Sequence, residues 1–262
     1  MHQVKKLKLK YYVNNKVFNL RPKFRTSVIL FISFAVGAFA LFLHNPKPQA
    51  DCGFVQNVYG QRISWNGKLP IEVEIDYSIP ADLKPAIYRA AKTWEVIAGQ
   101  PLFVFKQISK KNTGPNKDKK NGIYFLLNWD SNNRAEQGRT SVYWIGDEIQ
   151  EADIRINGAQ FAFYDRDPKN LVFLKNSDDT NLSGAKENSN LGRADFSSQS
   201  TQQPDLGYNF EALMLHELGH LLGLKHKELS PAISVMETYL AANTNRIELS
   251  DADKKNLTCE YK

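Results

Sequence analysis

Short apolar stretches separated by polar turns predict β-strands in the first part of the chain. In IEVEIDY, residues 71–77, apolar side chains alternate with acidic ones, as they do in a strand that buries one face. Further stretches of strand length follow. The expected strands cover residues 71–77, 102–108, 123–129, 140–146 and 152–158. A hairpin that turns at Asp167 and Pro168 is expected after them, within residues 161–174.

One helix is expected between residues 80 and 99, where apolar residues recur every three or four positions. Pro80 is suited to the start of this helix and Gly99 to its end. The spacing therefore predicts an amphipathic helix. Its buried face consists of Ile87, Ala91, Trp94 and Ala98.

Two more helices are expected near the C-terminus. Residues 208–223 are apolar on most sides and have Asn209 as a suitable N-cap, which predicts a largely buried helix. A short helix is expected after Ser250, because Ser250 and Asp253 resemble a capping box. Residues 176–203 are rich in Ser, Asn, Asp, Gln and Gly, which predicts a long flexible loop. Together these elements predict an α+β fold.

An uncharged apolar run, Val28 to Leu43, follows a strongly basic segment. It predicts a transmembrane signal-anchor or a signal peptide at residues 27–44. Sharp changes in polarity on both sides argue against a buried core helix. Basic residues favour the cytoplasmic side of a membrane, so residues 1–26 are expected in the cytoplasm. Residues 45–51 would then be a tether to a body outside the cytoplasm, which is membrane-anchored or, after cleavage, secreted.

The net charge of +6 comes from this leader. Residues 1–50 hold nine Lys and Arg and no acid, which leaves 25 basic and 28 acidic residues in residues 51–262. A body that binds nucleic acid should concentrate positive charge on its own surface. The acidic balance therefore argues against a nucleic-acid partner.

The two cysteines, Cys52 and Cys259, stand at the two ends of the exported body. In an oxidising compartment their simplest role is a disulfide that ties the start of the body to its end. The alternative is two unrelated free thiols.

Three of the five histidines lie within HELGHLLGLKH, residues 216–226. On a helix, His216 and His220 lie one turn apart on one face, so both rings can bind one metal ion. Gly223 is suited to end that helix, because glycine adopts the left-handed conformation that reverses the chain. This turn can bring His226 to the same ion. Three protein ligands leave a position for water, as in catalytic zinc sites.

Glu217 points about 100° away from His216 around the helix axis. It is badly placed as a third ligand but well placed to contact a water molecule at the metal. The pattern therefore predicts peptide-bond hydrolysis in which Glu217 acts as general base and no covalent intermediate forms. The motif has five specified residues, His216, Glu217, His220, Gly223 and His226. Their spacing favours a metal site over a Leu-rich core helix with structural histidines.

The motif residues match the pattern H-E-x-x-H-x-x-G-x-x-H of metzincin zinc endopeptidases in full. Within that clan, residues 52–262 are most similar to the matrixin, or matrix-metalloprotease-like, family. ISVMETY resembles the clan's Met-turn, which would place Met236 beneath the metal. The resemblance implies a twisted mixed five-stranded sheet, about three helices and one catalytic Zn²⁺ in a cleft.

The resemblance also implies how a substrate would bind. In the family an edge strand binds an extended peptide through its main chain, and that strand would be RTSVYWIG, residues 139–146. Tyr239 is expected either to line the pocket for the side chain beyond the cut bond or to belong to the core. The expected partners are a peptide or protein substrate and, through the leader, a membrane. The protein is expected to be monomeric.

The chain departs from the family in several respects. Outside the motif only His2 and His44 remain, so a second, structural zinc site with histidine ligands is not expected. No calcium loop is recognisable, although calcium binding stays open, and residues 176–203 are an insertion. Family propeptides can carry a zinc-bound cysteine before glycine. The residues around Cys52 do not match that motif, so the disulfide is preferred.

These observations predict an exported zinc-dependent endopeptidase. The alternative is a metzincin scaffold without hydrolytic activity that binds peptides or proteins at the cell surface. A scaffold released from catalysis could lose Glu217, and this chain keeps it.

Overall fold

The computed structural model describes residues 47–108, 114–172, 207–227 and 233–262. The chain divides into two units, Met1–Pro46 and Lys47–Lys262, and all described residues belong to the second. The predicted leader and membrane segment, and the predicted loop at residues 176–203, lie outside the described residues. Among the residues described, no helix is both long enough and apolar enough to cross a membrane.

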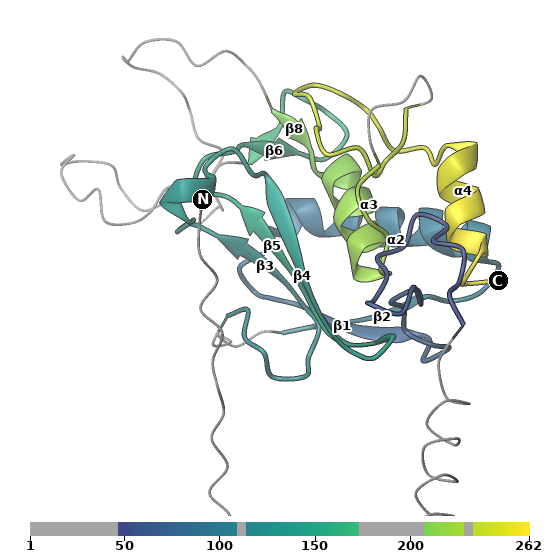
Figure 1. The fold of residues 1–262 in the computed structure, drawn as a ribbon. Helices are drawn as coiled ribbons and strands as arrows, with labels where there is room; N and C mark the ends of the chain where they lie inside the picture. The colour runs from purple at the N-terminus through teal and green to yellow at the C-terminus, as the bar shows by residue number, and fades with distance from the viewer. Residues whose placement is uncertain (1–46, 109–113, 173–206, 228–232) are drawn as a thin grey trace, which may run out of the picture. The chain divides into compact units, whose positions relative to one another are not determined.

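A mixed five-stranded sheet lies at the centre of the second unit (Figure 1). The strand order is β2-β1-β3-β5-β4, and only the edge strand β4 runs antiparallel to its neighbour. The five predicted strands are all present, and residues 139–146 overlap the edge strand as expected. Their bounds are β1 Ile71–Ile75, β2 Phe103–Gln107, β3 Gly122–Leu126, β4 Gly138–Ile145 and β5 Glu148–Asn157.

Strand β5 begins at Glu148, before the predicted start at residue 152. A β-bulge explains the difference, because Tyr143 pairs with Glu151 while the next residue, Trp144, pairs with Ile149. A bulge adds an unpaired residue and interrupts the alternation of faces. The strict alternation of apolar and polar residues expected for a strand therefore does not reveal where β5 begins.

Three α-helices are present among the described residues, as predicted. They are α2 Lys84–Ala98, α3 Phe210–Leu221 and α4 Asp251–Thr258. The helix expected from Pro80 opens with a short 3₁₀ turn, η1 Ala81–Leu83, and ends at Gly99 with a φ of 69°. Ser250 and Asp253 form a complete capping box at α4.

Helices α2 and α3 lie on the same face of the sheet (Figure 1). Apolar residues of β1 and β5, such as Val73 and Ile154, are fully buried in this layer. The two helices are joined by Trp94, a buried residue of α2 whose indole Nε1–H donates to the carbonyl of Leu215 at 2.9 Å. Helix α3 is thus held in the core, next to the edge of the sheet.

A second, three-stranded sheet has the order β7-β6-β8. The predicted hairpin is confirmed by β6 Phe163–Tyr164 and β7 Leu171–Val172, which pair antiparallel. Strand β8, Tyr208–Asn209, runs parallel to β6 and leads directly into α3. The other short element is the 3₁₀ turn η2, Ser131–Asn133, before β4.

Cys52 and Cys259 form a disulfide with a Cα–Cα distance of 6.3 Å. It ties the start of the second unit to the residue that follows α4. The structure therefore has the expected pairing, and both alternatives, free thiols and a zinc-bound Cys52, are absent from it.

Candidate metal centre

Helix α3 holds the first two histidines of the motif. The side chain of Asn209 caps the helix by accepting a hydrogen bond from the N–H of Ala212 at 3.1 Å. The helix is buried on nearly all sides against the sheet and α2. His216 and His220, one turn apart, both line a cleft beside β4. The rigidity of the packed helix fixes the spacing of the two rings.

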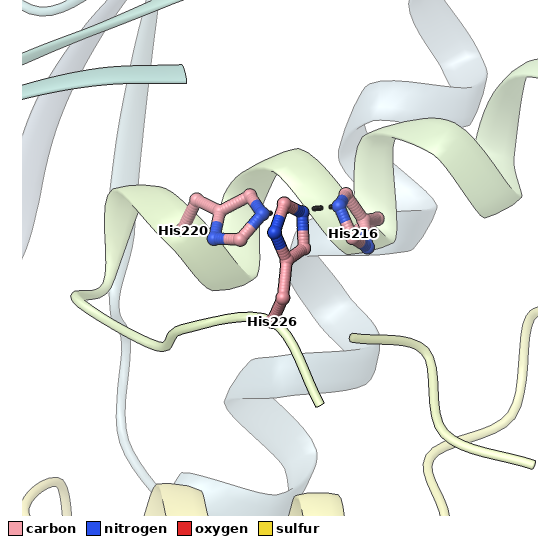
Figure 2. Close-up of side chains that lie close together, drawn as sticks. All are labelled: His216, His220 and His226. Carbon is pink, nitrogen blue, oxygen red and sulfur yellow. Dashed lines mark hydrogen bonds between the residues drawn. The ribbon is translucent and has the colours of Figure 1, made fainter. Parts of the chain in front are cut away.

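The ring orientations of His216 and His220 are set by their Nδ1 atoms. Nδ1–H of His216 donates to the carbonyl of Val235, and Nδ1–H of His220 donates to the carbonyl of Leu224, each at 2.7 Å. Because a carbonyl can only accept, each Nε2 carries a lone pair. The two Nε2 atoms lie 3.0 Å apart (Figure 2). Facing lone pairs repel at this distance unless they share a cation, so the donor set fits a metal ion.

Gly223 ends the helix and turns the chain toward His226. Its φ of 101° is in the left-handed region that favours glycine. A Cβ at this position would also lie 2.3 Å from the carbonyl oxygen of Ile63. Two independent constraints therefore require glycine at this turn.

The turn brings His226 to the other two rings. Its ring centroid lies 4.5 Å from that of His220 and 5.2 Å from that of His216. One ligand atom from each ring lies within 4.8 Å of the other two. Zinc binds imidazole nitrogen at about 2.1 Å, which places tetrahedral ligands about 3.4 Å apart. The three ligand atoms therefore lie close enough together to share one ion.

Burial favours the neutral form of all three imidazoles. It lowers the pKa of His216 well below its ordinary value, and the neighbouring His220 adds to that shift. Burial also lowers the pKa of His220 to about 4 and lowers the pKa of His226. Neutral imidazole is the form that binds metal. Within the described ranges, no other group of three His, Cys, Asp or Glu lies close enough to hold an ion.

Glu217 lines the same cleft, between α3 and β4. Its carboxylate accepts a hydrogen bond of 2.6 Å from the hydroxyl of Thr140. Its other oxygen lies against Gly138, where a Cβ would be only 2.7 Å away. Burial raises the pKa of Glu217 to about 7, against the opposing effect of the Thr140 hydrogen bond. A buried carboxylate with a pKa near neutrality has the properties of a general base.

Met236 is buried against α3, on the side of Gly219. A Cβ on Gly219 would lie 2.4 Å from the Met236 sulfur, so any larger residue there would require Met236 to move. The preceding residue, Val235, supplies the carbonyl that accepts from His216. The structure thus joins the residue next to Met236 to the first histidine, and the placement of Met236 beneath a metal stays a prediction.

Asp253 of α4 holds this turn in place. Its carboxylate accepts hydrogen bonds from the N–H of Val235 at 3.1 Å and from the hydroxyl of Ser234. It also accepts from Ser250, where it closes the capping box. Helix α4 is therefore connected to His216 through one residue, Val235.

The cleft has a volume of about 690 Å³ and runs between β4 and the turn after Met236. Tyr239 lines this cleft with 70% of its surface exposed, so the alternative that it belongs to the core is wrong. Val55 and Trp144 line the cleft as well. An edge strand and a lined cleft together form a surface suited to an extended chain.

The sequence did not identify Gly138, Thr140 or Asp253 as parts of the site. Thr140 precedes Glu217 by 77 residues, and no local pattern links the two. Asp253 was recognised only as part of a helix cap. These contacts arise from packing, for which the sequence carries no short-range signal.

Comparison with protein-family models matches residues 128–262 to the matrixin family. The matched segment is a little more than half of the chain, and it contains the three histidines, Glu217 and Met236. No curated protein matches the chain. Both the motif and the family match point to the same class, and the chain therefore belongs to the matrixin family of zinc metalloproteases.

Proposed function

We propose that this chain is an exported zinc-dependent endopeptidase that uses Glu217 as its general base. The observation that carries the proposal is the meeting of three imidazoles and one buried carboxylate in a single cleft beside an edge strand. Membership of the matrixin family supports the general class of metalloendopeptidase.

His216, His220 and His226 would hold the zinc ion. When bound, zinc supplies a Lewis acid that polarises the substrate carbonyl and acidifies the attacking water. The Nδ1–H bonds of His216 and His220 to main-chain carbonyls keep their rings oriented for this role.

Glu217 would move the proton. It takes a proton from the attacking water and passes it to the leaving amine nitrogen. Thr140 orients the carboxylate by donating to it, and Gly138 leaves the space that the carboxylate occupies. A base whose pKa is close to neutrality can both accept and return a proton.

The substrate would be an extended peptide or protein segment. Strand β4 has β5 on one side and lies at the edge of the sheet, so its main chain can pair with a peptide. Tyr239 and Leu240, in the turn after Met236, line the part of the cleft proposed for the side chain beyond the cut bond.

Glu217→Gln tests the catalytic assignment in the full-length protein loaded with zinc. General-base removal is expected to lower turnover of casein or a peptide library by about 10²–10⁴-fold, with one zinc ion still bound per chain. Glu248→Gln, an exposed acid outside the cleft, is the matched control and should retain wild-type turnover. A chelator should abolish the activity.

Two outcomes would contradict the proposal in different ways. Equal turnover by wild type and Glu217→Gln would refute the base assignment. A wild-type protein that binds zinc and peptides but never cleaves them would instead favour the non-hydrolytic scaffold.

Export and membrane anchoring are part of the same proposal. The disulfide supports an oxidising compartment for the body, and the apolar run at residues 27–44 is proposed as the anchor. Protease added outside intact cells should degrade a C-terminal tag on the full-length chain. Recovery of the tag with membranes would support the anchor, whereas recovery from the soluble exported fraction would support signal cleavage.

A further inference from the structure

The turn that carries the third histidine is paired to the start of the second unit. We call residues 222–226 the ligand turn and residues 50–65 the N-terminal segment. The N–H of Lys225 donates to the carbonyl of Gly53 at 2.8 Å, and the N–H of Val55 donates to the carbonyl of Gly223 at 3.0 Å. Phe54 and Leu224 form an antiparallel bridge between these two bonds. The residue directly before His226 is thus held by main-chain pairing.

The end of α3 also depends on residues from outside the helix. The last carbonyls of a helix lack intrahelical partners. Trp65 Nε1–H donates to the carbonyl of Leu221 at 2.8 Å, and the hydroxyl of Tyr261 donates to that of Leu222 at 2.7 Å. Tyr261 itself accepts from the N–H of Trp65 at 3.1 Å. The two ends of the second unit therefore jointly fix the start of the ligand turn.

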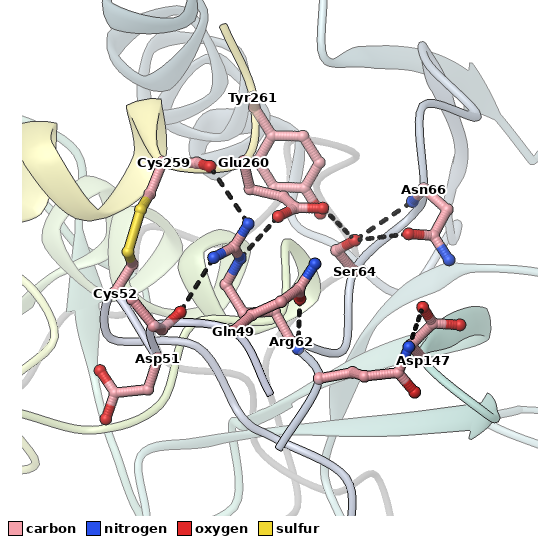
Figure 3. A network of polar contacts seen from close by, with 12 residues as sticks. Gln49, Asp51, Cys52, Arg62, Ser64, Asn66, Asp147, Cys259, Glu260 and Tyr261 are labelled. Carbon is pink, nitrogen blue, oxygen red and sulfur yellow. Dashed lines mark hydrogen bonds and ion pairs between the residues drawn. A yellow bond between two sulfur atoms is a disulfide. The ribbon is translucent and has the colours of Figure 1, made fainter. Parts of the chain in front are cut away.

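The disulfide anchors the N-terminal segment at the residue before Gly53 (Figure 3). Beside it, Arg62 donates to Glu260 at 2.7 Å and to the carbonyl of Ala50 at 2.9 Å. The ion pair between Asp51 and Lys225 is half exposed and contributes little by comparison. The covalent bond therefore anchors residues 50–54 together with the fully buried side chain of Phe54.

We propose that the disulfide between Cys52 and Cys259 positions the third metal ligand. By fixing Gly53 and Val55 it fixes the ligand turn, and with it the place of His226. The two cysteines are positioning residues, because neither lines the cleft. The N-terminal segment lies outside the matrixin-matched residues 128–262. The inference rests on the zinc site of the proposed function.

Loss of the disulfide should loosen the ligand turn before it affects the rest of the fold. His216 and His220 stay on the packed helix α3. His226 lies between two main-chain pairings, that of Lys225 with Gly53 and that of Lys227 with Met236, and loss of the disulfide affects the first of them. Loss of groups that support a metal ligand lowers metal affinity by about 10–100-fold. A loss in that range is therefore expected when both cysteines are replaced.

The test compares the full-length wild type with Cys52→Ser/Cys259→Ser. Zinc affinity is measured by competition with a chromogenic chelator, and hydrogen exchange of the Lys225 amide is measured in metal-free protein. Zinc affinity is expected to fall by about tenfold or more, and exchange at Lys225 to accelerate. Phe103→Leu, a buried residue of the distant edge strand β2, controls for general destabilisation and should retain wild-type zinc affinity.

A folded double variant with wild-type zinc affinity would overturn the inference. If the double variant does not fold, the wild type is titrated with tris(2-carboxyethyl)phosphine instead. Zinc release before the loss of the near-ultraviolet circular dichroism signal supports the inference, and simultaneous loss of both overturns it. Neither readout requires peptide cleavage, so an inactive protein that binds zinc would contradict the proposed function alone.

Discussion

At the scale of single residues, two neighbours on β4 set the environment of the Glu217 carboxylate. Thr140 donates a hydrogen bond to its carboxylate, and Gly138 has no side chain to occupy the same space. The Glu217 side chain is almost fully buried, so the hydrogen bond has little competition from water. The chemistry of this carboxylate thus depends on a strand distant in sequence.

Thr140→Val removes the hydroxyl and keeps the shape of the side chain. Because the Thr140 hydrogen bond lowers the pKa of Glu217, its loss should raise that pKa. Glu217 must be deprotonated to accept a proton, so the acid limb of the kcat/KM profile should move to higher pH. One hydrogen bond contributes about 1 kcal/mol, so kcat/KM near pH 6 should fall roughly fivefold.

Thr93→Val is the matched control for this change. Thr93 lies on α2 outside the cleft, and its hydroxyl donates to the carbonyl of Arg89 at 3.1 Å. Its pH profile should coincide with that of the wild type. Superimposable profiles for Thr140→Val and wild type would show that the hydroxyl does not act on Glu217.

At the scale of elements, helix α4 supports the site without contributing a residue to the cleft. Its capping residue Asp253 is 1% exposed and accepts hydrogen bonds from Ser234, Val235 and Ser250. The cap predicted from the sequence is therefore also a link between elements. This second role was not predictable, because a capping box is a local pattern, whereas the bond to Val235 joins two elements.

Asp253→Ala should destabilise the protein by roughly 2–4 kcal/mol, because it leaves several buried donors without an acceptor. The free energy of unfolding in urea measures this loss. Asp251→Ala is the control, because Asp251 is a fully exposed acid of the same helix and its ion pair with Lys254 contributes little to stability. This change should alter the free energy of unfolding by less than about 0.5 kcal/mol. Equal stability of the two variants would rule out Asp253 as a link between elements.

At the scale of the whole molecule, stability is expected to depend on pH through Asp153. This residue of β5 is 2% exposed, and it accepts a hydrogen bond from the N–H of Gly122 at 3.0 Å. Burial raises its pKa from 3.8 to about 7, and the nearby acids Glu151 and Asp118 add to the shift. A raised pKa means that the folded state binds the proton more tightly than the unfolded state.

The stabilising contribution of Asp153 is therefore complete below about pH 4 and is lost as the pH rises through about 7. Asp153→Asn should remove this dependence. The free energy of unfolding of the variant, relative to that of the wild type, should therefore be greater at pH 8 than at pH 5 by on the order of 1–3 kcal/mol. Urea unfolding of wild type and variant at the two pH values measures the difference. Asp82→Asn, an exposed acid of η1, should leave the wild-type pH dependence unchanged.

Much of the fold followed from local patterns. Alternating and helical spacings located the five strands and the three helices, and Asn209, Gly99 and Gly223 were correctly expected at helix ends. These features depend on residues within a few positions of each other, so a sequence displays them directly. The bulge in β5 was not predicted from the pattern, because it depends on pairing with β4.

The sequence by itself determined the proposed ligand set, since the spacing of His216, His220 and His226 has its effect within one helix and one turn. Only the tertiary structure decided what surrounds that set. It brought Thr140 to Glu217, joined Asp253 to Val235, and paired Gly53 with Lys225. Contacts between residues distant in sequence depend on the packing of whole elements, and no short stretch of the chain specifies the geometry of that packing.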